Sequence, residues 1–155
     1  MTLASIIRQK LSEAPAANTR HQFVADDPHS GWTLYLTAER RDAWTAVTWE
    51  MCLRRAASGG DVASWAQRVA QRSSGLLEAL RVVEVDLANN KALIRSEPPT
   101  ERDGKVSYYE VVLEGAASAL VRRFEATHTS GNREQVAFVL TNEVLAKWMG
   151  DLTAD

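Results

Sequence analysis

Repeated alternation of apolar and polar residues in the second half of this chain constrains its fold more than any other feature. Four segments show the pattern, namely residues 81–87, 92–96, 106–113 and 118–126. In the first segment Val83, Val85 and Leu87 form an apolar row that we expect to be buried, because a period of two is typical of a half-buried strand. Asn89-Asn90 suits a tight hairpin turn. The stretch therefore predicts a four-stranded antiparallel meander.

A long helix is predicted to close this meander, over residues 132–149. Apolar residues recur there at helical spacing, at Ala137, Leu140, Val144 and Trp148. Asn132 and Gln135 have the spacing of a capping box. We expect Gly150 to end the helix, since glycine is the usual residue at such a stop.

The first half of the chain predicts two helices with a meander between them. Three strands are expected at residues 21–25, 32–38 and 43–53. Thr2 is expected to cap a first helix that runs to about Ala14, and Asp61 to cap the second. Residues 39–42 are expected to form a charged turn.

The predicted element order is therefore α-βββ-α-ββββ-α. We interpret it as an α+β fold, an antiparallel sheet with three helices largely on one face. A length of 155 residues favours a single domain over residues 1–155.

Composition excludes few classes of protein but sets expectations about partners and location. Charged residues make up 25% of the chain and the net charge is -2, which gives no electrostatic footprint for nucleic acid or acidic lipid. No segment approaches the roughly 20 apolar residues that span a bilayer. The single cysteine cannot form an intramolecular disulfide and fits a reducing compartment. We therefore expect a cytoplasmic protein with no membrane or nucleic-acid partner.

The densest group of potential metal ligands consists of His21, Asp26, Asp27 and His29. Imidazole and carboxylate groups together can bind Zn²⁺. Their spacing matches no established motif, and residues 26–31 have the composition of a β-turn. We therefore predict a turn and no metal site.

Cys52 is the candidate nucleophile, because a neighbouring His21, His29 or His128 would lower its pKa. A lone cysteine in an apolar strand is more often a small core residue. Without a phosphate-binding loop or a paired acid and base, the sequence predicts no catalytic residue and no cofactor.

Charged residues inside the predicted strands suggest ion pairs. Three arginine pairs occur at residues 40–41, 54–55 and 122–123, either as one anion-binding face or as solvated surface, and we predict the latter. Arg122 and Arg123 must point to opposite sides of their strand. Glu50 and Glu110 are predicted either to be buried carboxylates with a raised pKa or to pair with cross-strand arginines.

Aromatic residues give the clearest indication of a binding surface. Five tryptophans are too many for one face of one sheet. If helices cover one face, the other is expected to bear Tyr35, Trp44 and Tyr108, and an exposed aromatic face usually marks a site for a partner. The alternative is that the sheet curls and buries these rings itself.

The order of elements resembles that of the small α+β fold of type III secretion chaperones, over nearly the whole chain. That resemblance implies a dimeric protein-binding module without catalysis. Our first hypothesis is accordingly a non-catalytic, chaperone-like interaction module of unknown partner, which we expect to be a homodimer. The second is a small-molecule-binding domain or minor enzyme, with a pocket between the curved sheet and a helix.

Overall fold

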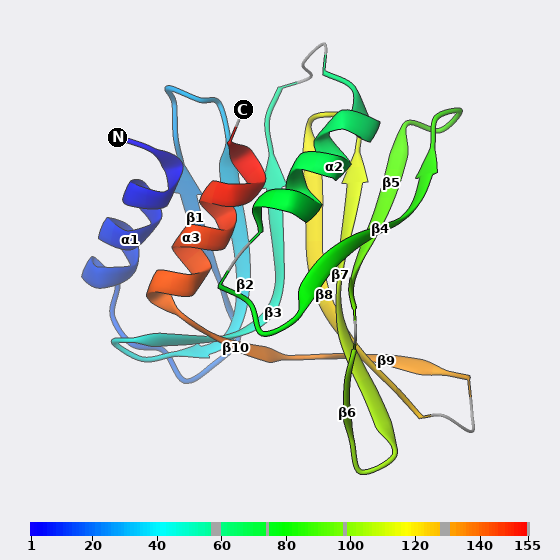
Figure 1. The fold of residues 1–155 in the computed structure, drawn as a ribbon. Coiled ribbons are helices and arrows are strands. Elements are labelled where there is room, and N and C mark those ends of the chain that lie inside the picture. The colour runs from blue at the N-terminus through cyan, green and yellow to red at the C-terminus, as the bar shows by residue number, and fades with distance from the viewer. Residues whose placement is uncertain (57–59, 74, 98, 128–130, 155) are drawn as a thin grey trace.

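A computed structural model describes residues 1–56, 60–73, 75–97, 99–127 and 131–154 of the chain (Figure 1). Within these ranges it contains three α-helices and a ten-stranded antiparallel sheet. The structure thus confirms the predicted α+β class and the predicted order of elements, with additional strands.

The elements follow one another with short connections. The helices are α1 (Leu3–Glu13), α2 (Val62–Arg72) and α3 (Asn142–Thr153). The strands are β1 (His21–Asp26), β2 (Thr33–Arg41), β3 (Thr45–Arg54), β4 (Ala79–Asp86), β5 (Lys91–Glu97), β6 (Thr100–Arg102), β7 (Lys105–Glu114), β8 (Ser118–Thr127), β9 (Arg133–Val136) and β10 (Phe138–Thr141).

The sheet has the strand order β1-β2-β3-β8-β7-β5-β4, in which β7 is an interior strand. Strands β3 and β8 pair only between residues 51–54 and 118–121. Beyond that point they diverge, and the chain at 133–141 lies between them. There β9 pairs with β8 and β10 pairs with β3.

All three helices lie on one face of the sheet, with α3 between α1 and α2 (Figure 1). The core forms in the layer between them. Its largest fully buried side chains include Trp32, Leu34, Leu36, Met51 and Leu53 from the N-terminal half, and Leu113, Leu145, Trp148 and Met149 from the C-terminal half. No helix of the described residues covers the opposite face of the sheet.

Two of the predicted helix caps are confirmed. Thr2 accepts a hydrogen bond from the Ser5 backbone N–H at 3.1 Å, and Asp61 accepts one from Ala63 at 3.0 Å. Each satisfies an N–H of the first turn that has no partner inside the helix.

The predicted start of the last helix is wrong. Residues 133–141 form β9 and β10, and α3 begins at Asn142 with Thr141 as its cap. The backbone of residues 133–136 pairs instead with β8, and that of residues 138–141 pairs with β3. The gap between those two strands is a tertiary feature that no helical spacing reveals.

Gly150 does not end α3, which continues to Thr153. A Cβ atom at Gly150 would lie 3.1 Å from the Cβ of Ala4 in α1. The glycine therefore permits the close approach of two helices, a packing role instead of the predicted stop.

Two strand predictions are also wrong in detail. The expected charged turn at 39–42 belongs mostly to β2, where Arg41 is buried and donates to His21 Nε2 at 3.3 Å. In β4 a register shift at Val83 leaves that residue exposed, and Leu87 is exposed because it lies in the turn that follows the strand. A bulge of one residue reverses which side chains face the core.

Candidate functional site: the uncovered face of the sheet

One row of apolar residues crosses the uncovered face over six adjacent strands. Cross-strand pairing joins its members directly in the order Val24, Tyr35, Cys52, Leu120, Val112 and Leu93. We call these six residues the apolar row. Paired residues in an antiparallel sheet share a face. Their chain neighbours, such as Leu34 and Leu36 beside Tyr35, are buried on the helix side.

Two polar rows border the apolar row. The first polar row consists of Asp26, Thr33, Arg54, Ser118, Glu114, Lys91 and Asp86, each paired with the next. The second polar row consists of Gln22, Thr37 and Glu50 on one side of the β3–β8 divergence, and Arg122, Glu110 and Arg95 on the other. Charges alternate in sign along both rows. An apolar centre with a polar rim is the usual anatomy of a protein interface.

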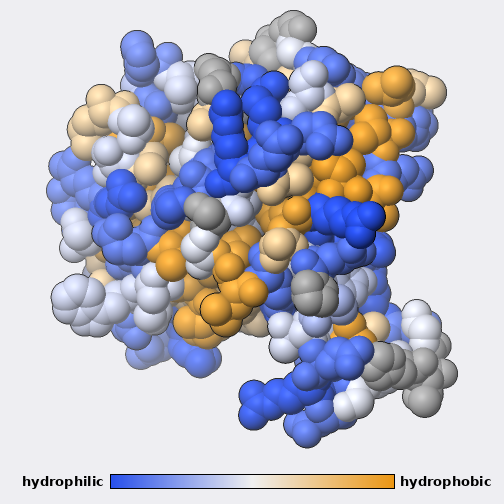
Figure 2. Space-filling model, in the orientation of Figure 1, coloured by the Kyte–Doolittle hydropathy of each residue, from blue (hydrophilic) through white to orange (hydrophobic). Residues whose placement is uncertain are grey.

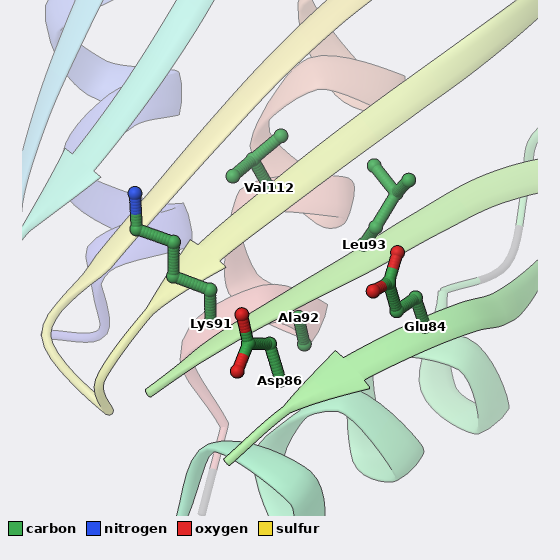
Figure 3. Close-up of a pocket in the computed structure, with 6 residues that line it drawn as sticks. All are labelled: Glu84, Asp86, Lys91, Ala92, Leu93 and Val112. Atoms are coloured by element: carbon green, nitrogen blue, oxygen red, sulfur yellow. The ribbon is translucent and has the colours of Figure 1, made fainter. Parts of the chain in front are cut away.

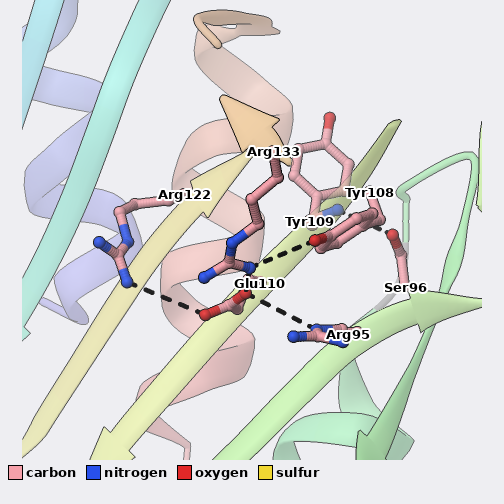
Figure 4. A network of polar contacts seen from close by, with 7 residues as sticks. All are labelled: Arg95, Ser96, Tyr108, Tyr109, Glu110, Arg122 and Arg133. Carbon is pink, nitrogen blue, oxygen red and sulfur yellow. Dashed lines mark hydrogen bonds and ion pairs between the residues drawn. The ribbon is translucent and has the colours of Figure 1, made fainter. Parts of the chain in front are cut away.

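Glu110 anchors the second polar row (Figure 4). It is 3% exposed and forms ion pairs with Arg95, Arg122 and Arg133. The distances to Arg95 and Arg122 are 3.6 and 3.9 Å. The expectation of a cross-strand arginine partner is therefore confirmed for Glu110. Three guanidinium groups around one carboxylate leave a local excess of positive charge.

Aromatic rings support the guanidinium groups of this cluster. The Arg133 guanidinium lies 3.8 Å from the centre of the Phe124 ring, and that of Arg95 lies 5.2 Å from the Tyr108 ring. Arg133 also donates to the Tyr108 hydroxyl at 3.2 Å. Cation–π contacts of this kind fix long side chains that solvent would otherwise leave free.

The uncovered face is hollowed near both ends of the apolar row. A cavity of about 200 Å³ is lined by Glu84, Asp86, Lys91, Ala92, Leu93 and Val112 (Figure 3). A second cavity of about 330 Å³ is lined by Gln22, Tyr35, Thr37, Glu50, Cys52 and Arg54. Cys52 and Arg54 both line the second, and the interaction with Cys52 is the main reason that the pKa of Arg54 lies above its ordinary value. Both hollows combine apolar residues of the row with charged rim residues.

The structure separates the three predicted binding residues. Tyr35 lies in the apolar row, half-buried. Tyr108 lies on the same face but beyond the second polar row, opposite Phe124. Trp44 is in the turn between β2 and β3, 78% exposed, and its carbonyl accepts from the Asn142 backbone at the start of α3. Its predicted place on a strand is wrong.

The predicted turn at 26–31 is present and uses the candidate metal ligands for local hydrogen bonds. Asp27 accepts from Ser30 Oγ at 2.6 Å and from the His29 N–H at 3.0 Å. The hydrogen bond from Ser30 is the main reason that the pKa of Asp27 lies below its ordinary value. Asp26 accepts from Thr33, and His21 contacts Arg41. Among the described residues no group of three such side chains is placed to hold a metal ion.

The remaining candidates are also dispersed. Cys52 lies in the middle of the apolar row, while His21 and His29 make their contacts elsewhere and His128 lies outside the described residues. Arg122 and Arg123 point to opposite faces, as predicted, and pair with Glu110 and Glu78. The arginine pairs therefore do not form one anion-binding face.

A separate pocket of about 450 Å³ opens on the helix side, between the residues before β4, the β9–β10 segment and α3. Leu77 and Val139 stand at its rim, fully and 61% exposed. On the helix side of the molecule, Figure 2 shows apolar surface around the lower end of α3. Tyr109, Glu78 and Arg123 line its polar part.

Glu78 holds that polar part together. It pairs with Arg123 at 3.0 Å and accepts hydrogen bonds from Ser96 and Thr100. Burial raises the pKa of Glu78, but the hydrogen bonds from these three side chains outweigh burial and hold the pKa below its ordinary value. Glu78 therefore remains a carboxylate at neutral pH.

Sequence reasoning missed the apolar row and the Glu78 cluster. The row depends on the register of six strands, and the β2–β3 and β4–β5 pairings contain register shifts that alternation does not show. Glu78 precedes its strand and meets Arg123 across 45 residues of chain. The sequence does indicate the single members of the row, since each is an apolar residue flanked by core residues in a predicted strand, but it does not give the register that joins them.

Comparison with protein-family models, with curated proteins and with solved structures finds no match to this chain. Within the described residues, no helix combines the length and the apolar character that crossing a membrane requires.

Proposed function

We propose that this chain is a non-catalytic interaction module that binds a polypeptide through the uncovered face of its sheet. The observation that supports this proposal is the apolar row, continuous over six strands and bordered by two polar rows. A chaperone-like role of the kind that the order of elements suggests falls within this proposal. The cytoplasm is its proposed location, because the chain has a single cysteine.

The physical argument concerns the cost of leaving the row in water. Apolar surface gains about 25 cal/mol for each Å² removed from water, so a continuous row favours a covering partner. The charged residues of the polar rows would fix the orientation of the partner, because they attract groups of opposite charge and repel groups of like charge. Both hollows are shallow parts of this same face, which suits a protruding side chain of a protein partner.

Site-specific photo-crosslinking tests the proposal. We would place p-benzoylphenylalanine at Leu120, in the centre of the apolar row, and at Glu13 as the control, an exposed residue on α1. Irradiation of the producing cells should give protein adducts from the Leu120 position and few from the Glu13 position. Absence of adducts at Leu120, with correct folding of the substituted chain, would overturn the proposal.

A second candidate is the binding of a small molecule on the helix side. The pocket of about 450 Å³ there combines apolar walls with the converging polar groups of Tyr109, Glu78 and Arg123, which is typical of ligand sites. Thermal-shift screening with small amphipathic molecules tests it. Stabilisation should disappear in a Val144→Trp chain, because the larger side chain would fill the pocket.

A further inference from the structure

We propose that the polypeptide covering the uncovered face is a second copy of this chain, related by a two-fold axis that runs parallel to the strands midway between β3 and β8. This inference rests on the proposed function and names its partner. It is drawn from the register of the three rows on that face.

The apolar row is self-complementary about that axis. Two sheets packed face to face with two-fold symmetry have their axis in the plane between them, so each strand faces its mirror position in the row. Strand β3 then faces β8 of the second copy, β2 faces β7, and β1 faces β5. Cys52 meets Leu120 of the second copy, Tyr35 meets Val112, and Val24 meets Leu93.

The polar rows are complementary under the same operation. Glu50 faces Arg122 of the second copy and Asp26 faces Lys91. Within these six strands, each other charged residue of the two polar rows faces a neutral side chain of the second copy, as Glu110 faces Thr37. No like charges oppose each other in either row.

An axis along β8 or along the apolar row brings like charges together. An axis along β8 would place Glu50 against Glu110 of the second copy and Asp26 against Asp86. An axis along the apolar row would place Glu114 against Glu110. Like charges opposed across an interface cost several kcal/mol in principle. The axis between β3 and β8 therefore opposes all six members of the apolar row without opposing like charges.

The size of the face indicates how stable such a dimer is. Six strands about 4.8 Å apart and three rows about 7 Å apart cover roughly 500–600 Å² of each copy, compared with about 800 Å² per partner in a typical specific interface. Both sheets are twisted, so the strands nearest the axis approach most closely. We therefore expect a dimer that dissociates on dilution, with Glu50 and Arg122 as its most sensitive charged pair.

Charge reversal with rescue tests the inference. Sedimentation velocity over a range of concentrations should give the wild-type chain a mass of twice 17.1 kDa at the high end. Glu50→Arg and Arg122→Glu should each raise the dissociation constant of the dimer at least about tenfold. The double variant should return this constant to the wild-type value. Glu13→Arg, on the helix side, is the control and should leave it unchanged.

Each contrary result has a defined meaning. A chain that is monomeric at all concentrations, single variants that dimerise like wild type, or a double variant that fails to recover would each overturn the inference. If Arg122→Glu does not fold, because it loses Glu110, the exchange of Asp26 and Lys91 (Asp26→Lys with Lys91→Asp) repeats the test with exposed partners. If Leu120 crosslinks only to a different protein, the inference that the partner is a second copy is overturned, while the proposed function stands.

Discussion

Two buried tryptophans in this core differ in one hydrogen bond, which makes them a matched pair. Trp65 Nε1 donates to the Leu152 carbonyl at 2.9 Å, whereas Trp148 Nε1 is buried without a partner among the described residues. Trp65 is 3% exposed and Trp148 is fully buried. Each replacement by Phe removes a similar volume, but only one leaves an unsatisfied carbonyl.

We therefore predict that Trp65→Phe lowers the free energy of unfolding by about 1–2 kcal/mol more than Trp148→Phe, because an unpaired buried polar group costs about that much. Chemical denaturation of the two variants measures the difference. Equal losses would mean that the hydrogen bond to Leu152 contributes nothing net.

Some of these residue-scale features could be predicted from the sequence. Alternation places Arg122 and Arg123 on opposite faces, and it makes Glu110 a candidate for cross-strand pairing. The identity of its partners could not be predicted, because Arg133 reaches Glu110 from β9, a strand that the sequence pattern assigns to a helix.

At the scale of elements, Glu78 connects the entry of β4 to three other strands. Ser96 is in β5, Thr100 in β6 and Arg123 in β8. Because the pKa of Glu78 is lowered in the folded state, its contribution is full above the unfolded value of about 4.3 and is lost as the pH falls through the folded value.

We predict that Glu78→Gln costs about 2–3 kcal/mol near pH 7, since it leaves Arg123 without a charged partner, and that this cost shrinks as the pH falls below about 4. Urea denaturation at several pH values measures both. Glu97→Gln is the control, because its pair with Arg81 is exposed and should cost less than about 0.5 kcal/mol throughout. A cost of Glu78→Gln that does not vary with pH would contradict the assignment.

The boundaries of the elements could be predicted where local signals determine them. The predictions failed where tertiary structure determines the boundary. Thr2 and Asp61 cap their helices through neighbouring N–H groups, so the sequence suffices. The spacing of Ala137 and Leu140 fits a helix, but the unpaired edges of β3 and β8 bind this segment as two strands. The gain from completing two ladders exceeds a modest helical preference.

For the whole molecule, one layer of helices and one sheet leave a face of the sheet that no helix of the described residues covers. The class of fold and the presence of an uncovered face were predictable from the order of elements. The apolar row was not, because it requires six registers at once, and one shift of a single residue would move every side chain of a strand to the other face.

The position of Cys52 allows the whole-molecule inference to be tested by chemistry. In the dimer that we infer, Cys52 faces Leu120 of the second copy, so association covers the thiol. We predict that its reaction with iodoacetamide slows as protein concentration rises through the dissociation constant. Leu120→Lys should abolish this dependence, because a lysine in the centre of the apolar row opposes dimerisation. A Cys52→Ser chain with Glu13→Cys is the control and should react at the same rate at every concentration, since Glu13 is exposed on α1. A wild-type rate that does not change with concentration, in a chain shown to dimerise, would place the interface on another surface.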